Sequence, residues 1–444
     1  MTGENFYNVT EWQNGDPYTD IGSVINSIIA DIKRRQNSKD QRSGGKPGAV
    51  IYIPPGDYHL TSQVVIDISY LKIMGSGHGF TSSSIRFNTS AQELESWHEL
   101  WPGGSRILVD LKPEINAGEE AGAAFYIKRE GNPRLSSVEF SDFCIDGLHF
   151  ANDGEEKDNI ENTYINGKTG IYAASAQDSF RITGMGLVYL EHGVVMYYSD
   201  ALNIHDNFIA ECGNCIELRG WGQASKITDN LIGAGYRGYS IFAQNCGGLL
   251  ISANNIFPRG ESSIYFDGVT RSTITANRLH AFYWGMIILM GNCSENLISA
   301  NHFLRDYEPW TPMQKYNNRR GSKYGIVWIT GNYNSVIANH FSLVLMQADF
   351  ESNEAKPVII RIASGRGNFI STNHMVAVKG KAEASDACFS AQVGALLTAE
   401  SELFSVTAVM VEANAVDNTV LDSGSEGQVI IDKNQNSFRP TPTL

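Results

Sequence analysis

The stretch IHDNFI at residues 204–209 follows the pattern apolar-x-x-Asn-x-apolar, with Asn207 in the fourth position. The pattern returns six times, at intervals of 23, 24, 23, 24, 38 and 34 residues. The seven Asn residues are Asn207, Asn230, Asn254, Asn277, Asn301, Asn339 and Asn373. A period of 23–24 residues built from short β-type runs is typical of one coil of a parallel β-helix. Because neighbouring coils lie about 4.8 Å apart, the Asn side chains can pass amide hydrogen bonds from coil to coil.

A second short strand precedes the repeated Asn residues, beginning with Ile216-Glu217-Leu218. The period of two in a strand directs the outer two residues of each such triplet inward and the middle residue outward. The outward row reads Glu217, Phe242, Tyr265, Ile288, Val327 and Arg361. A contiguous apolar row predicts a surface that another subunit covers, or alternatively one that the chain's own long loops cover.

The two ends of the chain differ from the repeat. Residues 20–33 carry Ile and Val at helical spacing, which predicts a helix that caps the N-terminal end. We therefore expect an all-β, single-stranded, right-handed parallel β-helix with an N-terminal capping helix. The expected parts are a cap at residues 1–45, the β-helix at 46–376, and irregular coils with a tail at 377–444. Insertions are expected near 87–135, 305–322 and 345–357, where solenoids often carry binding loops.

The composition of the chain excludes some classes of binding partner. The 444 residues carry a formal net charge of −14, and no basic stripe is visible. Such a surface repels phosphate backbones, so nucleic acid is not an expected partner. No run of 18 apolar residues exists, so we expect no membrane span. The N-terminus has no signal-peptide features, which favours a cytoplasmic location, or an extracellular one if a leader has been removed.

Two carboxylates form the candidate catalytic pair. Glu217 interrupts the apolar outward row, and Asp206 precedes Asn207, 11 residues before Glu217 and about half a coil away. An acid and a base, both carboxylates, are what acetal cleavage requires. Burial among aromatic side chains is expected to raise the pKa of Glu217 and keep it protonated, whereas Asp206 in a polar turn is expected to stay ionised. The alternative is that Asp206 serves only the turn.

Three further residues are candidates for substrate binding. Asp229 occupies the position of Asp206 one coil later, Tyr265 lies on the outward row, and Trp310 lies in an expected insertion. Aromatic faces stack on sugar rings, and carboxylates bind their hydroxyl groups.

Two groups that could suggest metal binding lack the rest of a metal site. Cys212 and Cys215 form a C-x-x-C without a second pair, so buried, reduced thiols are expected. His302, His340 and His374 each follow a repeated Asn, without carboxylates or cysteines at matching offsets. Stacked surface imidazoles are therefore expected, and we expect no metal and no cofactor.

Three stretches together resemble the inulin fructotransferase and difructose dianhydride hydrolase family. They are the helix that starts at Asp20-Ile21, the strand VIYIPPGDY at residues 50–58, and the segment IHDNFIAECGNCIE at residues 204–217. The strand is generic to pectate-lyase-like helices, whereas the last segment is specific. The resemblance covers essentially the whole chain. It implies a right-handed parallel β-helix assembled as a homotrimer, active sites near subunit contacts, catalytic carboxylates at Asp206 and Glu217, and no cofactor.

The resemblance implies one of two activities on a small fructose-based saccharide or its polymer. Fructotransferases release a cyclic difructose dianhydride from inulin, and the hydrolase opens difructose dianhydride III to inulobiose with water. In both, Glu217 would protonate the departing oxygen and Asp206 would deprotonate the attacking hydroxyl or water. The leaderless start favours the hydrolase, because inulin is a polymer met outside the cell. Alternatives of other classes are a non-catalytic glycan-binding β-helix and a Ca²⁺-dependent pectate-type lyase.

Overall fold

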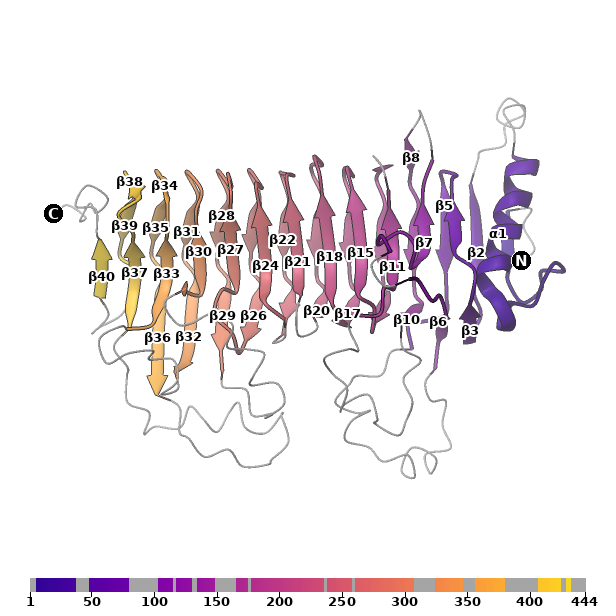
Figure 1. The fold of residues 1–444 in the computed structure, drawn as a ribbon, viewed down its shortest axis with the longest axis horizontal. Helices are drawn as coiled ribbons and strands as arrows, with labels where there is room; N and C mark the ends of the chain where they lie inside the picture. The colour runs from indigo at the N-terminus through magenta and orange to yellow at the C-terminus, as the bar shows by residue number, and fades with distance from the viewer. Residues whose placement is uncertain are drawn as a thin grey trace, which may run out of the picture. The chain divides into compact units, whose positions relative to one another are not determined.

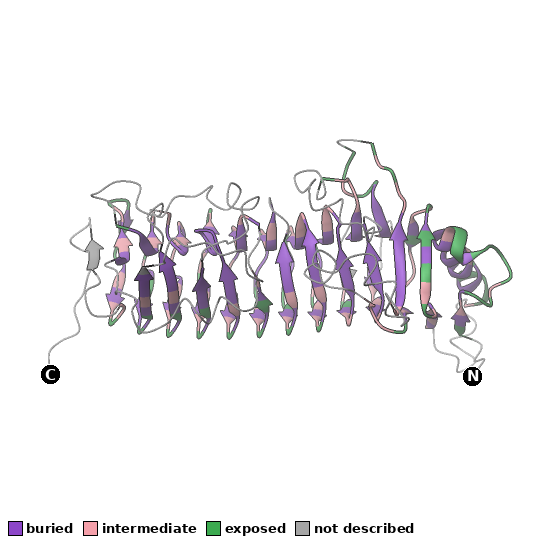
Figure 2. Ribbon diagram, turned by 90° about the horizontal axis from the view of Figure 1, so that it is seen from below, coloured by how far each residue is buried: buried purple, intermediate pink, exposed green. Residues whose placement is uncertain are grey.

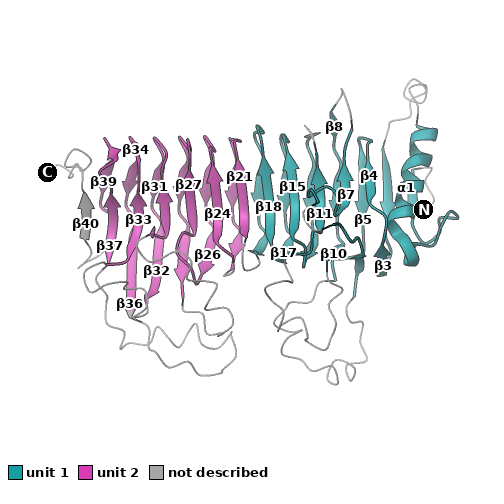
Figure 3. Cartoon of the chain, in the orientation of Figure 1, with its two compact units in different colours: residues 1–235 teal, residues 236–444 magenta. Residues whose placement is uncertain are grey.

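Short parallel strands stacked coil upon coil make up most of the part of the chain that the structure describes (Figure 1). The computed structural model describes residues 5–36, 48–79, 103–114, 117–129, 134–147, 165–174, 177–234, 238–257, 260–306, 324–345, 356–379, 406–424 and 429–432. The chain divides into two compact units, residues 1–235 and residues 236–444 (Figure 3). Within each unit the strands form three parallel sheets, called A, B and C here. The predicted parallel β-helix is confirmed.

Unit 1 contains the first coils. Its sheet A comprises β1 (Phe6–Asn8), β2 (Ala49–Tyr52), β5 (Leu71–Met74), β9 (Glu139–Ser141), β13 (Arg181–Thr183), β16 (Asn203–His205) and β19 (Lys226–Thr228). Sheet B comprises β3 (Gly56–Leu60), β6 (Ser105–Val109), β10 (Cys144–Asp146), β14 (Gly186–Val188), β17 (Phe208–Cys212) and β20 (Leu231–Ala234). Sheet C comprises β4 (Val64–Ile66), β7 (Ala123–Ile127), β11 (Thr169–Ala173), β15 (His192–Tyr197) and β18 (Asn214–Arg219). A short pair joins β8 (Leu135–Ser136) to β12 (Gln177–Asp178).

Unit 2 repeats this arrangement. Its sheet A comprises β22 (Leu250–Ser252), β25 (Thr273–Thr275), β28 (Leu297–Ser299), β31 (Ser335–Ile337), β35 (Phe369–Ser371) and β39 (Thr419–Leu421). Sheet B comprises β23 (Asn255–Ile256), β26 (Arg278–Ala281), β29 (His302–Arg305), β32 (His340–Leu345) and β36 (His374–Lys379). Sheet C comprises β21 (Tyr239–Gln244), β24 (Ser262–Asp267), β27 (Ile287–Met290), β30 (Val327–Ile329), β33 (Val358–Ile362), β37 (Thr407–Val411) and β40 (Val429–Asp432). A short pair joins β34 (Gly365–Arg366) to β38 (Ala415–Val416).

The helix α1 (Pro17–Arg35) confirms the predicted N-terminal helix. Asp16 caps it by accepting a hydrogen bond from the Tyr18 backbone N–H, and Pro17 occupies the first turn, where no N–H is required. Its buried stripe, which includes Ile25 and Ile28, packs against β3 and β4 of unit 1. No helix among the described residues is long and apolar enough to cross a membrane.

In-register stacking of apolar residues fills the interior. Ile182, Ile204 and Ile227 pair across β13, β16 and β19, and each is almost fully buried. In unit 2 the rings of Phe303 and Phe341 stack with centroids 4.4 Å apart. Figure 2 shows buried residues concentrated along the strands. Because each residue sits over its equivalent in the next coil, a period error of one residue would turn the apolar side chains outward.

The repeated Asn residues form a buried hydrogen-bonded ladder. In unit 2, Asn277 Nδ2 donates to Asn301 Oδ1 at 3.0 Å, and Asn301 donates to Asn339 at 3.1 Å. The Asn301 backbone N–H also donates to Asn339 Oδ1, and Asn301 Nδ2 reaches the Ile274 carbonyl. In unit 1 the same contact joins Asn207 to Asn230 at 2.9 Å. Each amide is thus fully satisfied without water, which is what burial of a polar group requires.

A second ladder runs beside the first in unit 2. It joins Asn296, Asn334, Asn368 and Asn418 by amide contacts of 2.9–3.1 Å, and each member lies within 1% of complete burial. Asn418 therefore belongs to the second ladder, and it lies five residues before the position that continues the first ladder. The sequence carried the signal, since Asn296, Asn334 and Asn368 each lie five residues before a repeated Asn.

One outward position differs from the sequence expectation. Ile288 of β27 pairs with Trp328 of β30, so Trp328, not Val327, stands in the outward row. Val327 is buried, and the half-buried Trp328 stacks on Tyr324 with ring centroids 4.0 Å apart. The sequence expectation places the inward and outward residues of this strand one position too early. The run Ile326-Val327-Trp328-Ile329 is apolar throughout, so no alternation shows which of its residues face inward. The three-part division at residues 45 and 376 stays a prediction.

The ladder predicts a stability cost for removing one rung. We expect Asn301→Ala to lower the free energy of unfolding by about 2 kcal/mol, because the buried Asn277 backbone N–H loses its side-chain acceptor, the Ile274 carbonyl loses its side-chain donor, and Asn277 Nδ2 loses one of its three acceptors. Chemical denaturation measures the change. The control, Asn255→Ala, removes an exposed Asn bonded only to Arg278 and should change stability by less than about 0.5 kcal/mol. Equal effects of the two substitutions would contradict the ladder's role.

Candidate active site

Glu217 is a buried acid on the outer face of sheet C. It lies in β18 between the inward-facing Ile216 and Leu218, and pairs in register with Val195 of β15. Its exposed fraction is 0%, although its side chain points away from the interior of the coil. On the same face Val195 packs with Ala123 and Tyr172, and Tyr197 lies beside this cluster. The predicted outward carboxylate is therefore covered by its own chain within unit 1.

Two cations hold this carboxylate. His192, the first residue of β15, places Nδ1 2.5 Å from Glu217 Oε1, and Arg219 donates through Nη2 to Glu217 Oε2. The other terminal nitrogen of Arg219 reaches Glu119 at 2.9 Å and the Tyr197 hydroxyl at 2.9 Å. Tyr197 in turn donates to Glu119 Oε2 at 3.4 Å. The result is a compact network of two acids, two bases and a phenol.

The network sets the protonation of Glu217. Burial alone raises the pKa of this carboxyl group, but the hydrogen bond and charge of His192 and the charge of Arg219 outweigh burial and bring the pKa below its usual value. For His192, burial lowers the pKa, and the hydrogen bond and charge of Glu217 more than compensate and raise it. The favoured form of the pair is an ionised Glu217 beside a protonated His192.

This corrects the expectation that Glu217 is held protonated. That expectation rested on burial among aromatic rings and took no account of two cationic neighbours. The sequence contained a signal for both. Arg219 lies two residues after Glu217, so it shares the outer face, and His192 lies 25 residues earlier, close to one coil period. Glu119 had no such signal, because it comes from the turn before β7.

Asp206 lies in the turn between sheets A and B. It has a left-handed backbone (φ 56°), its side chain is 66% exposed, and Oδ2 lies 2.7 Å from His205 Nδ1. The residues before the later ladder Asn residues are also left-handed, and these include Ala253, Ala276 and Ala300. Since alanine suffices for this turn, an Asp here is not a requirement of the backbone, which favours the functional interpretation over the turn interpretation.

Within one chain the two carboxylates lie on different segments of the same coil. Strand β17, of five residues, separates the turn of Asp206 from the coil segment that leads into β18, and it spans about 16 Å. Glycosidase carboxylates lie roughly 5–10 Å from one another. Among the interactions of the described residues, none joins Asp206 or His205 to the network around Glu217. The strand that separates the two segments is therefore longer than the usual spacing of a glycosidase pair.

The three residues predicted to bind substrate lie in different parts of the chain. Asp229 is exposed in a left-handed turn directly next to that of Asp206, because β16 and β19 pair in register. Tyr265 lies on the outer face of unit 2 and stacks on Phe242 with ring centroids 5.7 Å apart. Trp310 lies outside the described residues, as do most of the expected insertions near 305–322 and 345–357, whereas the described residues within 87–135 include the coil strands β6 and β7.

Glu119, His192 and Glu217 offer ligand atoms within 4.8 Å of one another, which is the spacing a metal ion requires. Arg219 already places a cation against both carboxylates, so the donors fit an arginine-centred ion network better than a metal. Cys212 and Cys215 are buried, free thiols, as expected, and burial raises the pKa of Cys215 well above its usual value.

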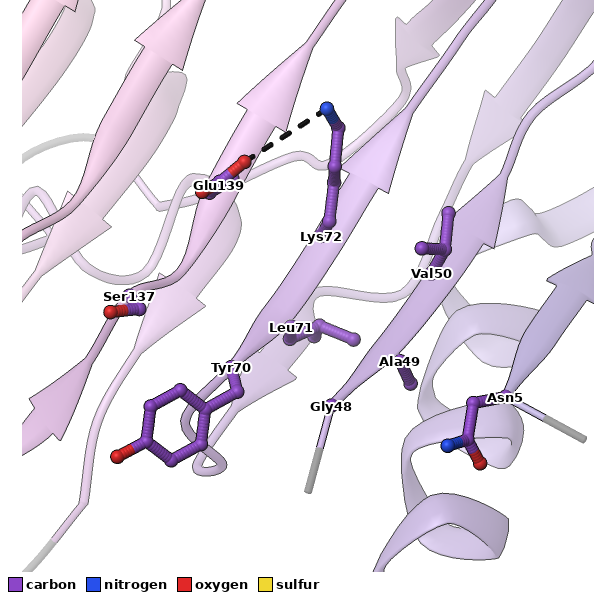
Figure 4. A pocket seen from close by; sticks show the side chains of 9 residues that line it. All are labelled: Asn5, Gly48, Ala49, Val50, Tyr70, Leu71, Lys72, Ser137 and Glu139. Carbon is purple, nitrogen blue, oxygen red and sulfur yellow. Dashed lines mark ion pairs between the residues drawn. The ribbon is translucent and has the colours of Figure 1, made fainter. Parts of the chain in front are cut away.

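A shallow pocket elsewhere in unit 1 is separate from this network. It lies over β2 and β5, and Tyr70, Lys72 and Glu139 line its rim, with Lys72 Nζ 3.9 Å from Glu139 Oε2 (Figure 4). None of its lining residues belongs to the network around Glu217 or to the turn of Asp206.

Comparison with known proteins places this geometry in a family. The chain is 42% identical to an inulin fructotransferase (DFA-I-forming) of Arthrobacter globiformis, over 83% of this chain and 88% of that protein. The chain belongs to the inulin fructotransferase family. Residues 300–442 match the family described as the β-helix repeat of inulin fructotransferase, and residues 135–333 match the periplasmic copper-binding protein NosD.

Solved structures are similar along the full chain. DFA-IIIase from Arthrobacter chlorophenolicus A6 in complex with DFA-III is 62% identical, covers 99% of both chains and has a TM-score of 0.90. The same enzyme in complex with GF2 is 61% identical, covers 100% of both chains and also has a TM-score of 0.90. The family resemblance drawn from residues 204–217 is thereby confirmed.

The ion network predicts a pH dependence of stability. The raised pKa of His192 means that its contribution is complete below about pH 6.5 and is lost as pH rises through the folded-state pKa. The lowered pKa of Glu217 means that its contribution is complete above about pH 4.5 and is lost as pH falls through the folded-state pKa. The pair therefore stabilises the fold most between these two values.

We expect His192→Gln to flatten the fall in Tm on the alkaline side of this window. Thermal melts of both proteins across the window and above it measure the effect. His59→Gln is the matched control, since His59 is half exposed and its pairing with Asp110 is screened by solvent. An alkaline limb that persists unchanged in His192→Gln would show that the pair does not set it.

Proposed function

We propose that this protein is a glycoside hydrolase that opens difructose dianhydride III to inulobiose. The observation that carries the proposal is the similarity, over 99% of both chains, to a DFA-IIIase whose structure contains DFA-III. Membership of the inulin fructotransferase family makes the chain an enzyme acting on fructans.

The chemistry follows from the groups around Glu217 and Asp206. Water attacks an anomeric carbon, one of the ring-bridging C–O bonds breaks, and the departing oxygen takes a proton. Asp206, exposed in its turn, accepts the proton of the attacking water. Glu217 delivers a proton to the departing oxygen. Because Glu217 is held ionised, that proton comes from His192 Nδ1, which contacts Glu217 Oε1 directly.

Arg219 and Glu119 position this acid. Arg219 holds one oxygen of Glu217 and is itself held by Glu119 and Tyr197, so the other oxygen remains aligned with His192. The proton released to the product returns to His192 from solvent, and the proton taken by Asp206 returns to solvent, so one water is consumed for each bond cleaved.

The separation of the two carboxylates points to a site shared between copies. We infer that Asp206 of one subunit and Glu217 of a neighbouring subunit face the same sugar in a homotrimer. The five-residue strand between them supports this arrangement, because its length exceeds the usual spacing of glycosidase carboxylates. In a cyclic assembly each subunit gives one residue to each of two sites.

The second candidate function is inulin fructotransferase, in which a fructose hydroxyl replaces water as the attacking group. The 42% identity with the enzyme of Arthrobacter globiformis supports it. The experiment that separates the two activities incubates the protein with difructose dianhydride III and, in parallel, with inulin, and resolves the products by chromatography. We expect inulobiose from the dianhydride, and release of dianhydride from inulin as the faster reaction would reverse the assignment.

Removing either carboxylate should abolish turnover. We expect Asp206→Asn and Glu217→Gln each to lower kcat by about 10²–10⁴-fold, since each loses one proton transfer. The matched control is Asp417→Asn, which alters an exposed Asp that also has a left-handed backbone but precedes an Asn of the second ladder. Full activity in either catalytic variant would remove that residue from the mechanism.

Mixing the two inactive variants tests the shared site. When Asp206→Asn and Glu217→Gln are co-expressed, random assembly should restore about one quarter of the sites, because a quarter of the interfaces combine both intact residues. Purification by two different tags removes the inactive homotrimers, so the purified mixed trimers should show about one third of the activity of the unmodified protein, because one of their three interfaces combines both intact residues. Complete inactivity of the mixed oligomer would place both residues within one subunit.

A further inference from the structure

Three histidines stand in register on the outer surface of unit 2. His302, His340 and His374 are the first residues of β29, β32 and β36, and they pair directly across these strands. All three are exposed. None of them takes part in the network around Glu217 or in the turn of Asp206, so the proposed reaction does not explain why they align.

The Asn ladder fixes the position of each histidine. The backbone N–H of His302 donates to the Asn277 carbonyl, and those of His340 and His374 donate to Asn301 and Asn339, each at 2.9 Å. The three residues thus begin their strands at the same point of successive coils. Their backbone N–H groups are bonded to the carbonyls of buried Asn residues, so binding a ligand between them requires little ordering of the backbone.

The side chains of two of these histidines converge. The rings of His340 and His374 have centroids 4.9 Å apart, and His374 Nδ1 lies 3.0 Å from His340 Nδ1. Nitrogen ligands lie about 2.0–2.1 Å from Zn²⁺, so two of them at a right angle around one ion are about 2.9 Å apart. The observed spacing between these nitrogens is therefore that of two adjacent ligands on a single ion.

The charges around the three histidines favour cation binding at the end of the row that carries His340 and His374. Arg278 and His280 on β26 face His302, and burial together with His340 and these two groups lowers the pKa of His302. Around His340 the contributing neighbour is His374 alone, and burial followed by this imidazole lowers the pKa of His340. A cation would be repelled by Arg278 at the His302 end, which leaves His340 and His374 as the better pair of ligands.

We propose that His340 and His374 form a surface binding site for a divalent transition-metal ion of the class that prefers imidazole, such as Ni²⁺, Cu²⁺ or Zn²⁺. Water completes the coordination of the ion, and His302 lies beside the site with its ring centroid 5.1 Å from that of His340. Imidazole suits these ions and does not suit Mg²⁺ or Ca²⁺, which take oxygen ligands. Both histidines lie beyond residue 333, where the match to NosD ends.

Isothermal titration of the full chain with NiCl₂ tests the site, in a buffer that does not bind metal. We expect one ion per chain, and we expect His340→Gln and His374→Gln each to weaken binding by at least about tenfold. His59→Gln, which removes an exposed histidine from unit 1, should bind as the unmodified protein does. MgCl₂ should give no binding.

Two outcomes would overturn the proposal. One is no stoichiometric binding of Ni²⁺ or Zn²⁺ to the unmodified protein, and the other is binding that is unchanged in both His340→Gln and His374→Gln. Thermal melts without metal check that the variants are folded. Added Ni²⁺ should raise the Tm of the unmodified protein and of His59→Gln, but not that of His340→Gln or His374→Gln. Turnover of difructose dianhydride III should be unchanged in His340→Gln, since this residue lies outside the proposed catalytic groups.

Discussion

The hydrogen bond from one buried asparagine to the next is the constraint on which the structure depends. Each ladder amide satisfies a backbone N–H of the previous coil, a side chain of the next coil and a carbonyl, all inside the turn between sheets A and B. A turn with one left-handed residue leaves polar groups that no strand can satisfy, and an unpaired buried polar group costs about 1–3 kcal/mol. The ladder removes that cost in the coils that carry a ladder Asn and aligns the strands that follow.

The exact alignment of the coils determines where the functional side chains lie. Because each coil begins sheets B and C at the same point, outward side chains from different coils meet at fixed spacing, as His192 and Glu217 do across β15 and β18. The cluster around Glu217 is stable in a dry setting only because its charges balance. Glu119 and Glu217 oppose Arg219 and protonated His192, so the energetic cost of burial is offset by direct ion contacts.

The sequence was sufficient for the fold, because the period of Asn207 and its equivalents reports the coil directly. It was also sufficient to identify the family from residues 204–217. It failed at Val327, where a wholly apolar run hides the phase of the strand, and at the protonation of Glu217. The protonation of Glu217 depends on His192 from the preceding coil and on Arg219 two positions along its own strand, and an expectation based on burial alone does not include their charges. The second ladder, by contrast, was readable from its fixed offset of five residues.

The bond from Asn301 to Asn339 has the same geometry as that from Asn277 to Asn301, although 38 residues separate the first pair and 24 the second. Added length between two rungs therefore does not disturb the rungs themselves. For protein engineering, this makes the interval after β29 a natural insertion point: a foreign peptide or a small domain could be displayed there while the scaffold on both sides keeps its alignment.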